Sequence, residues 1–114
     1  MREEYDAGAV VWAPDPYSES ADPRPWLVLA ADCLPYHGEE YVCAALTLSD
    51  LDDNLKVGDA WVAGRNPDVT SFCSPWVLAT VKHDAIVNPQ GRVTETFART
   101  VAERSADYLT ADTA

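Results

Sequence analysis

Arg24 stands between two prolines at the opening of an apolar run, in the stretch "DPRPWLVLAAD". Pro23 and Pro25 hold the local backbone in extended or turn conformations. The guanidinium is therefore presented from a stiffened base, and its planar fork can meet an anion with two parallel hydrogen bonds. The alternative interpretation is a solvated arginine at the mouth of a strand.

Thr47 ends a second apolar run, "YVCAALT", and its hydroxyl could donate a hydrogen bond beside Arg24 if the two strand ends are adjacent. Ser49 and Asp50 follow immediately and are candidates to line the same groove. The alternatives are a β-favouring threonine at the edge of a strand and a turn-forming Ser-Asp pair.

The chain contains two histidines, His37 and His83. Imidazole is the side chain whose ordinary pKa suits proton transfer near neutral pH. His83 is the better candidate of the two, because it follows Lys82 at a predicted strand end. Both could also be surface histidines without a catalytic role.

The chain is acidic along its whole length. It has 19 Asp and Glu residues against 8 Lys and Arg residues, a formal net charge of −11, and only two lysines, Lys56 and Lys82. A scattered acidic, lysine-poor surface is typical of a protein from a high-salt cytoplasm, where charge preserves solubility and its self-repulsion is screened. We therefore infer a halophilic source. An acidic protein that binds a basic partner or mimics nucleic acid would show clustered acids, and only "SDLDDN" and "GEE" approach that.

The cysteine pattern indicates neither a metal site nor a redox site. Cys33, Cys43 and Cys73 are well separated and form no C-x-x-C pair. Cys43 is expected to be buried in a strand, and Cys73 to be half exposed. The chain has no run of 18 apolar residues and an acidic rather than basic N-terminal stretch, so we expect a cytoplasmic protein without a membrane span or a bound cofactor.

Apolar runs bounded by Pro, Gly and Asp predict five short strands, over residues 8–14, 24–31, 41–48, 60–63 and 75–82. Residues 83–91 are predicted to be a helical turn and a loop. Beyond them the pattern predicts a helix over residues 95–109, with Thr94 as its N-cap and a buried stripe formed by Phe97, Ala98, Val101, Ala102, Tyr108 and Leu109.

These elements predict one domain over residues 1–114, with frayed ends at 1–7 and 110–114. The fold class is mainly β, a compact and largely antiparallel barrel with a C-terminal helix.

The stretches "GAVVWAPDPYSESADPRPWLVLAAD", "EYVCAALTLSD" and "SPWVLATVKHDAI", closed by the terminal helix, resemble the MazF/PemK family of toxin endoribonucleases. In that family a Gly-led first strand precedes a loop with a Ser-Glu pair, matched here by Gly8, Ser18 and Glu19. An Arg-Pro then opens the second strand, matched by Arg24 and Pro25.

Two further features of the family are matched by Thr47, at the end of a later strand, and by Lys82, where a Ser-led strand usually ends in arginine. The resemblance covers about residues 8–109. It implies an SH3-like barrel of the MazF/PemK/CcdB type, commonly a homodimer, that cuts single-stranded RNA without a metal ion. It also implies a cognate antitoxin protein, a segment of which lies across the RNA groove.

The resemblance assigns roles to several of these residues. Metal-independent cleavage needs a deprotonated 2′-hydroxyl, a stabilised phosphorane charge and a protonated leaving oxygen. Arg24 would stabilise the charge, Thr47 would donate to a phosphate oxygen, and His83 would transfer a proton. The substrate-binding candidates are Ser18, Glu19, Ser49, Asp50 and Lys82, and the candidates for stacking on bases are Tyr17, Trp12 and Trp76. For the two tryptophans, burial in the core is the favoured alternative.

A second hypothesis is a non-catalytic barrel that works through protein contacts. It would hold an antitoxin-like partner or bind a large target, as the gyrase-poisoning relatives of this fold do. The pairing of Arg24 with Thr47 favours the nuclease. The overall acidity and the presence of Lys82 in place of arginine favour the binding module.

Overall fold

The structure of the chain is a computed structural model, which describes residues 4–20, 22–64 and 71–111. Its strands are β1 (Ala9–Pro14), β2 (Pro23–Ala30), β3 (Glu40–Thr47), β4 (Leu55–Lys56), β5 (Trp61–Gly64), β6 (Phe72–Lys82) and β7 (Asn88–Val93). The remaining elements are two 3-10 turns, Gly58–Ala60 and His83–Ala85, and one α-helix, α1 (Glu95–Thr110).

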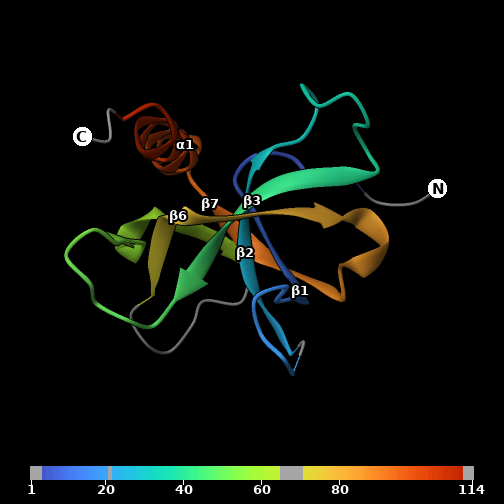
Figure 1. The fold of residues 1–114 in the computed structure, drawn as a ribbon, viewed down its shortest axis with the longest axis horizontal. Helices are drawn as coiled ribbons and strands as arrows, with labels where there is room; N and C mark the ends of the chain where they lie inside the picture. The colour runs from blue at the N-terminus through green and yellow to red at the C-terminus, as the bar shows by residue number, and fades with distance from the viewer. Residues whose placement is uncertain (1–3, 21, 65–70, 112–114) are drawn as a thin grey trace.

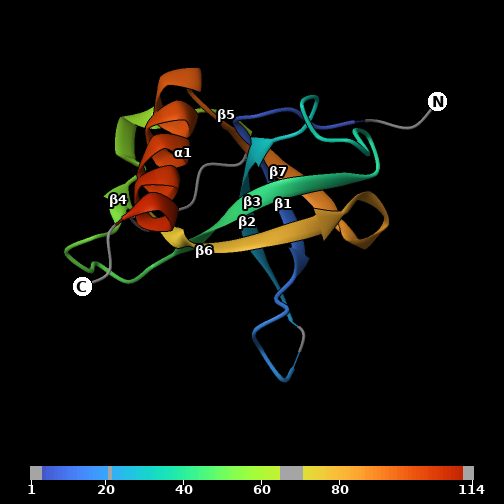
Figure 2. The same ribbon diagram turned by 45° about the horizontal axis from the view of Figure 1, so that its top comes forward.

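The described strands form one antiparallel sheet in the order β4-β6-β3-β2-β1-β7-β5. The sheet curves into a half-barrel, and α1 packs against β6 and β2 at one side of it (Figures 1 and 2). The loop between β1 and β2 projects beyond the ends of its strands, at the bottom of Figure 2. The mainly β class with a C-terminal helix is thereby confirmed.

Side chains alternate between two apolar clusters, one on each face of the curved sheet. On the face away from the helix, Trp26 and Tyr41 are completely buried, and the rest of that cluster comprises Ala9, Val11, Ala13, Val28, Ala31, Cys43, Ala45 and Val81. The cluster beneath α1 comprises Val10, Leu27, Ala44, Leu46, Val57, Cys73, Val93, Ala98 and Val101. Burial on both faces explains why β1, β2 and β3 appear in the sequence as unbroken apolar runs rather than as alternating patterns.

Two strands were missed by the sequence interpretation, and one begins earlier than expected. Strand β4 is only two residues long, and β7, "NPQGRV", lies where a loop was predicted. Strand β6 begins at Phe72 rather than at Pro75, because the register irregularity between Ala44 and Ala45 of β3 lets a proline stay in the strand without breaking the ladder. The helical turn predicted after Lys82 is confirmed.

The early start of β6 corrects the prediction for one cysteine. Cys73 is not half exposed but completely buried in the cluster beneath α1. Burial raises the pKa of its thiol to about 12, and the pKa of buried Cys43 also to about 12, so both are inert thiols. Within the described ranges, no group of three or more His, Cys, Asp or Glu side chains is placed to hold a metal ion.

The C-terminal helix begins as predicted and ends differently. Thr94 is confirmed as the N-cap, since its hydroxyl accepts a hydrogen bond from the backbone N–H of Phe97 at 3.1 Å. The buried face consists of Ala98, Val101 and Ser105, whose hydroxyl donates to the Pro75 carbonyl of β6 at 2.6 Å. Tyr108 and Leu109 were wrongly included in the buried stripe and are 41% and 75% exposed. In the described part of the chain, this helix and the 3-10 turns are too short or too polar to cross a membrane.

Candidate functional site

A cleft of about 630 Å³ lies where β2 begins and β3 ends. Both strands contribute, together with the β1–β2 loop, the start of the β3–β4 loop and one residue of β7. The residues that line it are Trp12, Asp15, Ser18, Ser20, Asp22, Pro23, Arg24, Pro25, Leu46, Thr47, Leu48, Ser49, Ser71 and Gln90.

The pairing of β2 with β3 brings Arg24 and Thr47 to the same place. Trp26 pairs with Ala45, so two residues further along each strand Arg24 lies level with Thr47. Residues directly opposite each other in an antiparallel pair have Cβ atoms about 5 Å apart. The side chain of Arg24 also reaches β3, because its Nη2 donates at 2.7 Å to the carbonyl of Leu46, the residue before Thr47.

Three contacts fix the guanidinium of Arg24. Besides the Leu46 carbonyl, its Nη1 donates to Asp15 Oδ2 at 3.2 Å, and its central carbon lies 5.6 Å from the centre of the Trp26 ring. The Arg24 side chain is 29% exposed, and its Nε is buried with no partner among the described residues. A cation held in this way can receive a ligand with little loss of conformational entropy.

The prolines explain where the ladder stops. Pro14 pairs with Pro23 at the end of β1 and β2, and a proline has no backbone N–H to continue the pairing. The ladder therefore ends one pair beyond the Ala13–Arg24 pair, which places Arg24 near the rim of the sheet.

The hydroxyl of Thr47 is oriented toward donation. Its Oγ1 accepts a hydrogen bond from the backbone N–H of Ser49 at 3.2 Å, which leaves its own hydrogen available for a ligand. The loop that follows is anchored by Asn54, whose amide donates to the Ser49 carbonyl at 2.9 Å and accepts from the Ser74 hydroxyl at 2.7 Å. Ser49 is thus held beside Thr47 at the cleft.

The β1–β2 loop is organised by Asp15. Its Oδ1 accepts a hydrogen bond from the backbone N–H of Tyr17 at 2.8 Å while its Oδ2 contacts Arg24. The Tyr17 hydroxyl donates to the Leu78 carbonyl of β6, and its ring stays 66% exposed. Tyr17 is therefore an anchored and exposed aromatic residue of the β1–β2 loop, which stands in the sequence between Asp15 and Ser18 of the cleft lining but does not itself belong to that lining.

The other aromatic candidates differ in position. Trp12 lines the cleft and is partly buried. Trp76 lies elsewhere, with its ring packed edge-on against Tyr108 of α1 at 5.8 Å. Trp76 is therefore neither part of the cleft nor buried in the core.

The described lining of the cleft is rich in hydroxyls and poor in positive charge. It contains one cation, Arg24, against two carboxylates, Asp15 and Asp22. The hydroxyls come from Thr47 and four serines, of which Ser18 and Ser20 lie 2.9 Å apart. A ligand here would meet a single fixed cation surrounded by neutral hydrogen-bonding groups.

Lys82 and His83 do not lie at this cleft. Lys82 pairs with Glu40 at the start of β3, whereas Thr47 is at its end. Seven residues of strand separate the two ends, about 23 Å at the usual rise per residue. The expectation that Lys82 and His83 share one site with Arg24 is therefore wrong, because antiparallel pairing places the end of β6 beside the opposite end of β3.

Both residues have partners of their own at that far end. The ammonium of Lys82 is hydrogen-bonded to Glu40, a contact that raises the pKa of the lysine. The Nδ1 of His83 lies 2.8 Å from the hydroxyl of buried Tyr41, and the rings of His83 and Tyr5 are 5.8 Å apart. Lys82 and His83 therefore contact residues at their own end of the sheet, and neither lines the cleft that contains Arg24.

Of the remaining predicted substrate-binding residues, Ser18 and Ser49 line the cleft, whereas Glu19 and Asp50 do not. The sequence interpretation missed Asp15, Ser20, Asp22, Ser71 and Gln90. Asp15 carried one signal, an Asp-Pro dipeptide that favours a turn. Gln90 carried none, since its strand was not predicted.

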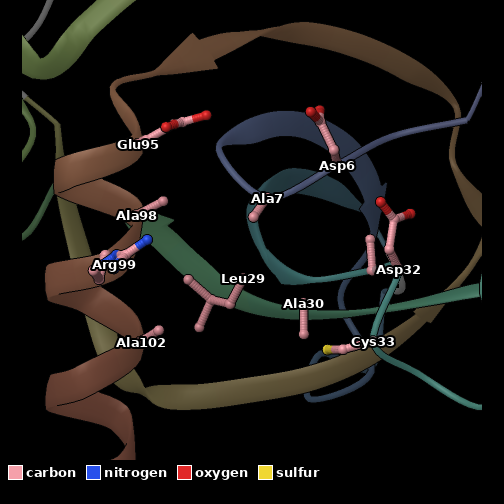
Figure 3. Close-up of a pocket in the computed structure, with 11 residues that line it drawn as sticks. Asp6, Ala7, Leu29, Ala30, Asp32, Cys33, Glu95, Ala98, Arg99 and Ala102 are labelled. Atoms are coloured by element: carbon pink, nitrogen blue, oxygen red, sulfur yellow. The ribbon is translucent and has the colours of Figure 1, made fainter.

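A second cavity, of about 440 Å³, lies between the N-terminal half of α1 and the end of β2. Figure 3 shows Glu95 and Arg99 on the helix side and Asp6 and Asp32 across from them, above a floor that includes Leu29. Three carboxylates against one arginine make this cavity a poor site for phosphate.

No protein-family model matches the sequence, and no curated protein matches it. Solved structures do match in fold. A MazE–MazF structure from Deinococcus radiodurans has a TM-score of 0.70 at 12% identity, with 97% of this chain and 100% of that chain covered. The Mycobacterium tuberculosis toxin MazF-mt6 has a TM-score of 0.67 at 17% identity, covering 92% and 99%. An endoribonuclease in complex with its cognate antitoxin, from Mycobacterial species, has a TM-score of 0.66 at 20% identity, covering 96% and 99%.

These matches extend over nearly the whole of both chains, whereas the identities are too low to carry residue roles across. The chain therefore has the fold of the MazF toxins, with its own Arg24 and Thr47 at one cleft of that fold.

Proposed function

We propose that this protein is a metal-independent endoribonuclease that cleaves single-stranded RNA, acting as the toxin of a toxin–antitoxin pair. The observation that carries the proposal is that Arg24 and Thr47 line one cleft. The likeness in fold to MazF endoribonucleases supports it independently.

In the proposed reaction the 2′-hydroxyl of one nucleotide gives up its proton to water and its oxygen attacks the adjacent phosphorus. The bond to the 5′-oxygen of the next nucleotide breaks, and that oxygen takes a proton from water. Negative charge builds on the non-bridging oxygens of the phosphorane. Arg24 is placed to stabilise that charge, and the free hydroxyl hydrogen of Thr47 can donate to one of the same oxygens. The products are a 2′,3′-cyclic phosphate and a free 5′-hydroxyl.

Base recognition would use the neutral part of the cleft. Single-stranded RNA is read by stacking and by hydrogen bonds to unpaired base edges. Tyr17 and Trp12 offer aromatic surface, while Ser18, Ser49 and Gln90 offer hydrogen-bonding groups.

The test incubates the purified protein with a mixed-sequence single-stranded RNA in EDTA and analyses the product ends. We expect cleavage with cyclic phosphate and 5′-hydroxyl ends, and no cleavage at a position where a single 2′-deoxynucleotide replaces the ribonucleotide. Cleavage of the deoxy-substituted bond, or 5′-phosphate products, would exclude attack by the 2′-oxygen.

The partners follow from the same proposal. We infer a cognate antitoxin protein that blocks the cleft, supported by the solved structures of similar fold that contain one. A homodimer in the cytoplasm completes the proposed assembly. Size-exclusion chromatography coupled to light scattering measures the stoichiometry directly.

The alternative function, a non-catalytic module that binds a protein, has one specific observation in its favour. The only described cation of the cleft is already paired with Asp15, and Asp22 adds a second negative charge. A basic peptide would suit such a lining better than RNA does. The same EDTA assay separates the two functions, since the module would leave RNA intact.

Salt should affect RNA binding only weakly. Each phosphate contact with a cation contributes about −0.7 to the slope of log affinity against log salt for a single strand. With Arg24 as the one described cation of the cleft, we expect a slope of about −0.7, so that a tenfold rise in KCl costs about fivefold in affinity. Fluorescence anisotropy with a labelled, non-cleavable oligonucleotide measures it. A much steeper slope would show that several cations outside this lining bind phosphate. A shallow slope would fit the halophilic source that we infer from composition.

Substitution of His83 or Lys82 should leave cleavage nearly unchanged. Both lie at the opposite end of β3 from Thr47, beyond the reach of a phosphate bound to Arg24. We expect His83→Gln and Lys82→Ala to alter kcat/KM by less than about twofold, since neither touches the reacting atoms. A loss comparable to that caused by Arg24 substitution would show that the catalytic centre lies at the Lys82 end of the sheet, and would contradict its assignment to Arg24.

A further inference from the structure

We propose that Asp15 is an internal counter-anion that an RNA phosphate must displace from Arg24. The inference rests on the proposed function, and it concerns how the same cleft regulates its affinity for RNA. Its starting point is that the cation best placed to meet a phosphate is already occupied by a carboxylate of the same chain.

The geometry makes Asp15 a competitor for the position that a phosphate would take. Its Oδ2 is 3.2 Å from Arg24 Nη1, and the Asp15 side chain is only 14% exposed. The Nε of Arg24 is buried, and Nη2 is held by the Leu46 carbonyl. The Nη1 side is therefore the part of the guanidinium where an incoming anion meets a carboxylate already in place.

Removal of Asp15 from the contact would not release Arg24 from the cleft. The hydrogen bond to the Leu46 carbonyl and the stacking over Trp26 do not involve Asp15. The guanidinium would stay at the rim with Nη1 free, and a phosphate could replace the carboxylate without a change in the sheet.

The same carboxylate also connects Arg24 to the loop. Its Oδ1 caps the turn at the Tyr17 backbone N–H, and Tyr17 is an exposed aromatic residue of the same loop. Exchange of Asp15 for phosphate would thus affect the aromatic surface and the cation together. This arrangement makes RNA binding depend on a fit that overcomes an existing ion pair, which disfavours weak, non-specific phosphate contacts.

Asp15→Asn separates charge from structure. The amide oxygen of asparagine can still accept the hydrogen bond from the Tyr17 N–H, because Asn forms the same turn as Asp. Its amide nitrogen carries no negative charge to hold Arg24. Asp22→Asn is the matched control, since Asp22 lines the same cleft and no ion pair joins it to Arg24.

The experiment measures binding of a fluorescein-labelled single-stranded DNA oligonucleotide, which cannot be cleaved by the proposed route, and steady-state cleavage of the matching RNA. We expect Asp15→Asn to lower Kd by about tenfold, because a phosphate would then no longer compete with a carboxylate, and close charge pairs at interfaces carry coupling energies of at least that size. The gain in affinity from Asp15→Asn should persist in molar KCl, because salt screens a short contact only weakly. Any gain from Asp22→Asn should vanish in molar KCl, because the Asp22 carboxylate would act on the oligonucleotide only over a longer distance.

Weaker or unchanged binding by Asp15→Asn would overturn the proposal, and weaker binding would show that Asp15 instead positions Arg24. Equal gains from Asp15→Asn and Asp22→Asn would also overturn it, since only the net charge of the cleft would then matter. Asp15→Ala, which removes the turn contact too, should bind more tightly than the wild type as well.

Failure of the proposed function would be recognised separately. If the wild type neither binds nor cuts nucleic acid, titration with inorganic phosphate, followed by NMR of the Arg24 side chain, still decides the question. Tighter phosphate binding by Asp15→Asn than by the wild type would support the counter-anion, and equal binding would refute it.

Discussion

Replacement of Arg24 by alanine should slow RNA cleavage by about a hundred- to a thousandfold, the first result that the structure leads us to expect. Arg24 is the only cation in the described lining of the cleft, which it shares with Thr47, and its Nη2 is bound to the carbonyl of Leu46, the residue before Thr47. Loss of one donor that stabilises charge in a transition state typically costs about a hundred- to a thousandfold in kcat. Single-turnover cleavage of a labelled RNA in EDTA measures the effect.

Two further variants define what Arg24 contributes. Arg24→Lys keeps the charge but not the planar fork, so we expect it to recover only a small part of the activity. Arg99→Ala is the matched control, an exposed arginine on α1 that lines the second cavity instead. Activity of Arg24→Ala close to that of the wild type would refute the assignment. Loss of its ion pair, in which the Arg24 and Asp15 side chains are 29% and 14% exposed, should lower the free energy of unfolding by about 1–3 kcal/mol. Circular dichroism of the variant checks that it stays folded.

Replacement of Trp26 by alanine should have the largest effect on stability. Trp26 is the largest completely buried side chain, packed on the face of the sheet away from α1, and its indole N–H donates to the Ala13 carbonyl at 3.3 Å. Truncation of a buried tryptophan to alanine lowers the free energy of unfolding by about 3–5 kcal/mol. Urea denaturation followed by circular dichroism measures the change.

The matched control for that substitution is Trp76→Ala. The Trp76 side chain is 39% exposed and packs edge-on against Tyr108, so its removal leaves no closed cavity. We expect a loss well below that of Trp26→Ala. Similar losses for the two variants would contradict the placement of the core. Because Trp26 also supports the guanidinium of Arg24, any folded Trp26 variant should have a weakened cleft as well.

The meeting of Arg24 and Thr47 was predictable from the sequence because it depends on strand ends alone. Two consecutive apolar runs joined by a short connection pair in antiparallel fashion in most β folds, which puts the start of the first beside the end of the second. The prolines around Arg24 marked the start of β2, and the "SD" after Thr47 marked the end of β3. Direction and order of two strands were sufficient.

The same rule, applied without the sheet order, misplaced Lys82 and His83. They also stand at a strand end, but β6 pairs antiparallel with β3, so its end lies beside Glu40 rather than Thr47. Strand β7 escaped prediction because "NPQGRV" holds a proline, a glycine and no apolar alternation. Gln90 was missed because it belongs to that strand. The ion pair of Asp15 was missed because it depends on a loop conformation that local sequence does not determine.

Strand β7 also shows why glycine is needed next to the cleft. Gly64 of β5 has a φ of +86°, and a Cβ there would lie 2.4 Å from the Gly91 Cα and 2.5 Å from the Gln90 carbonyl oxygen. Only a residue without a side chain permits so close an approach at that φ. The two glycines allow β5 to pair with β7, which holds Gln90 at the cleft.

The most direct test of the central claim is NMR mapping of the amide shifts that change when a non-cleavable single-stranded oligonucleotide is added. We predict changes at the start of β2, around Arg24, and at the end of β3, around Thr47. We also predict changes in the β1–β2 loop from Asp15 to Ser20. Residues around Lys82, and those of the cavity beside α1, should stay unshifted. Changes centred on Lys82 or on that second cavity, with none at Arg24, would contradict the account.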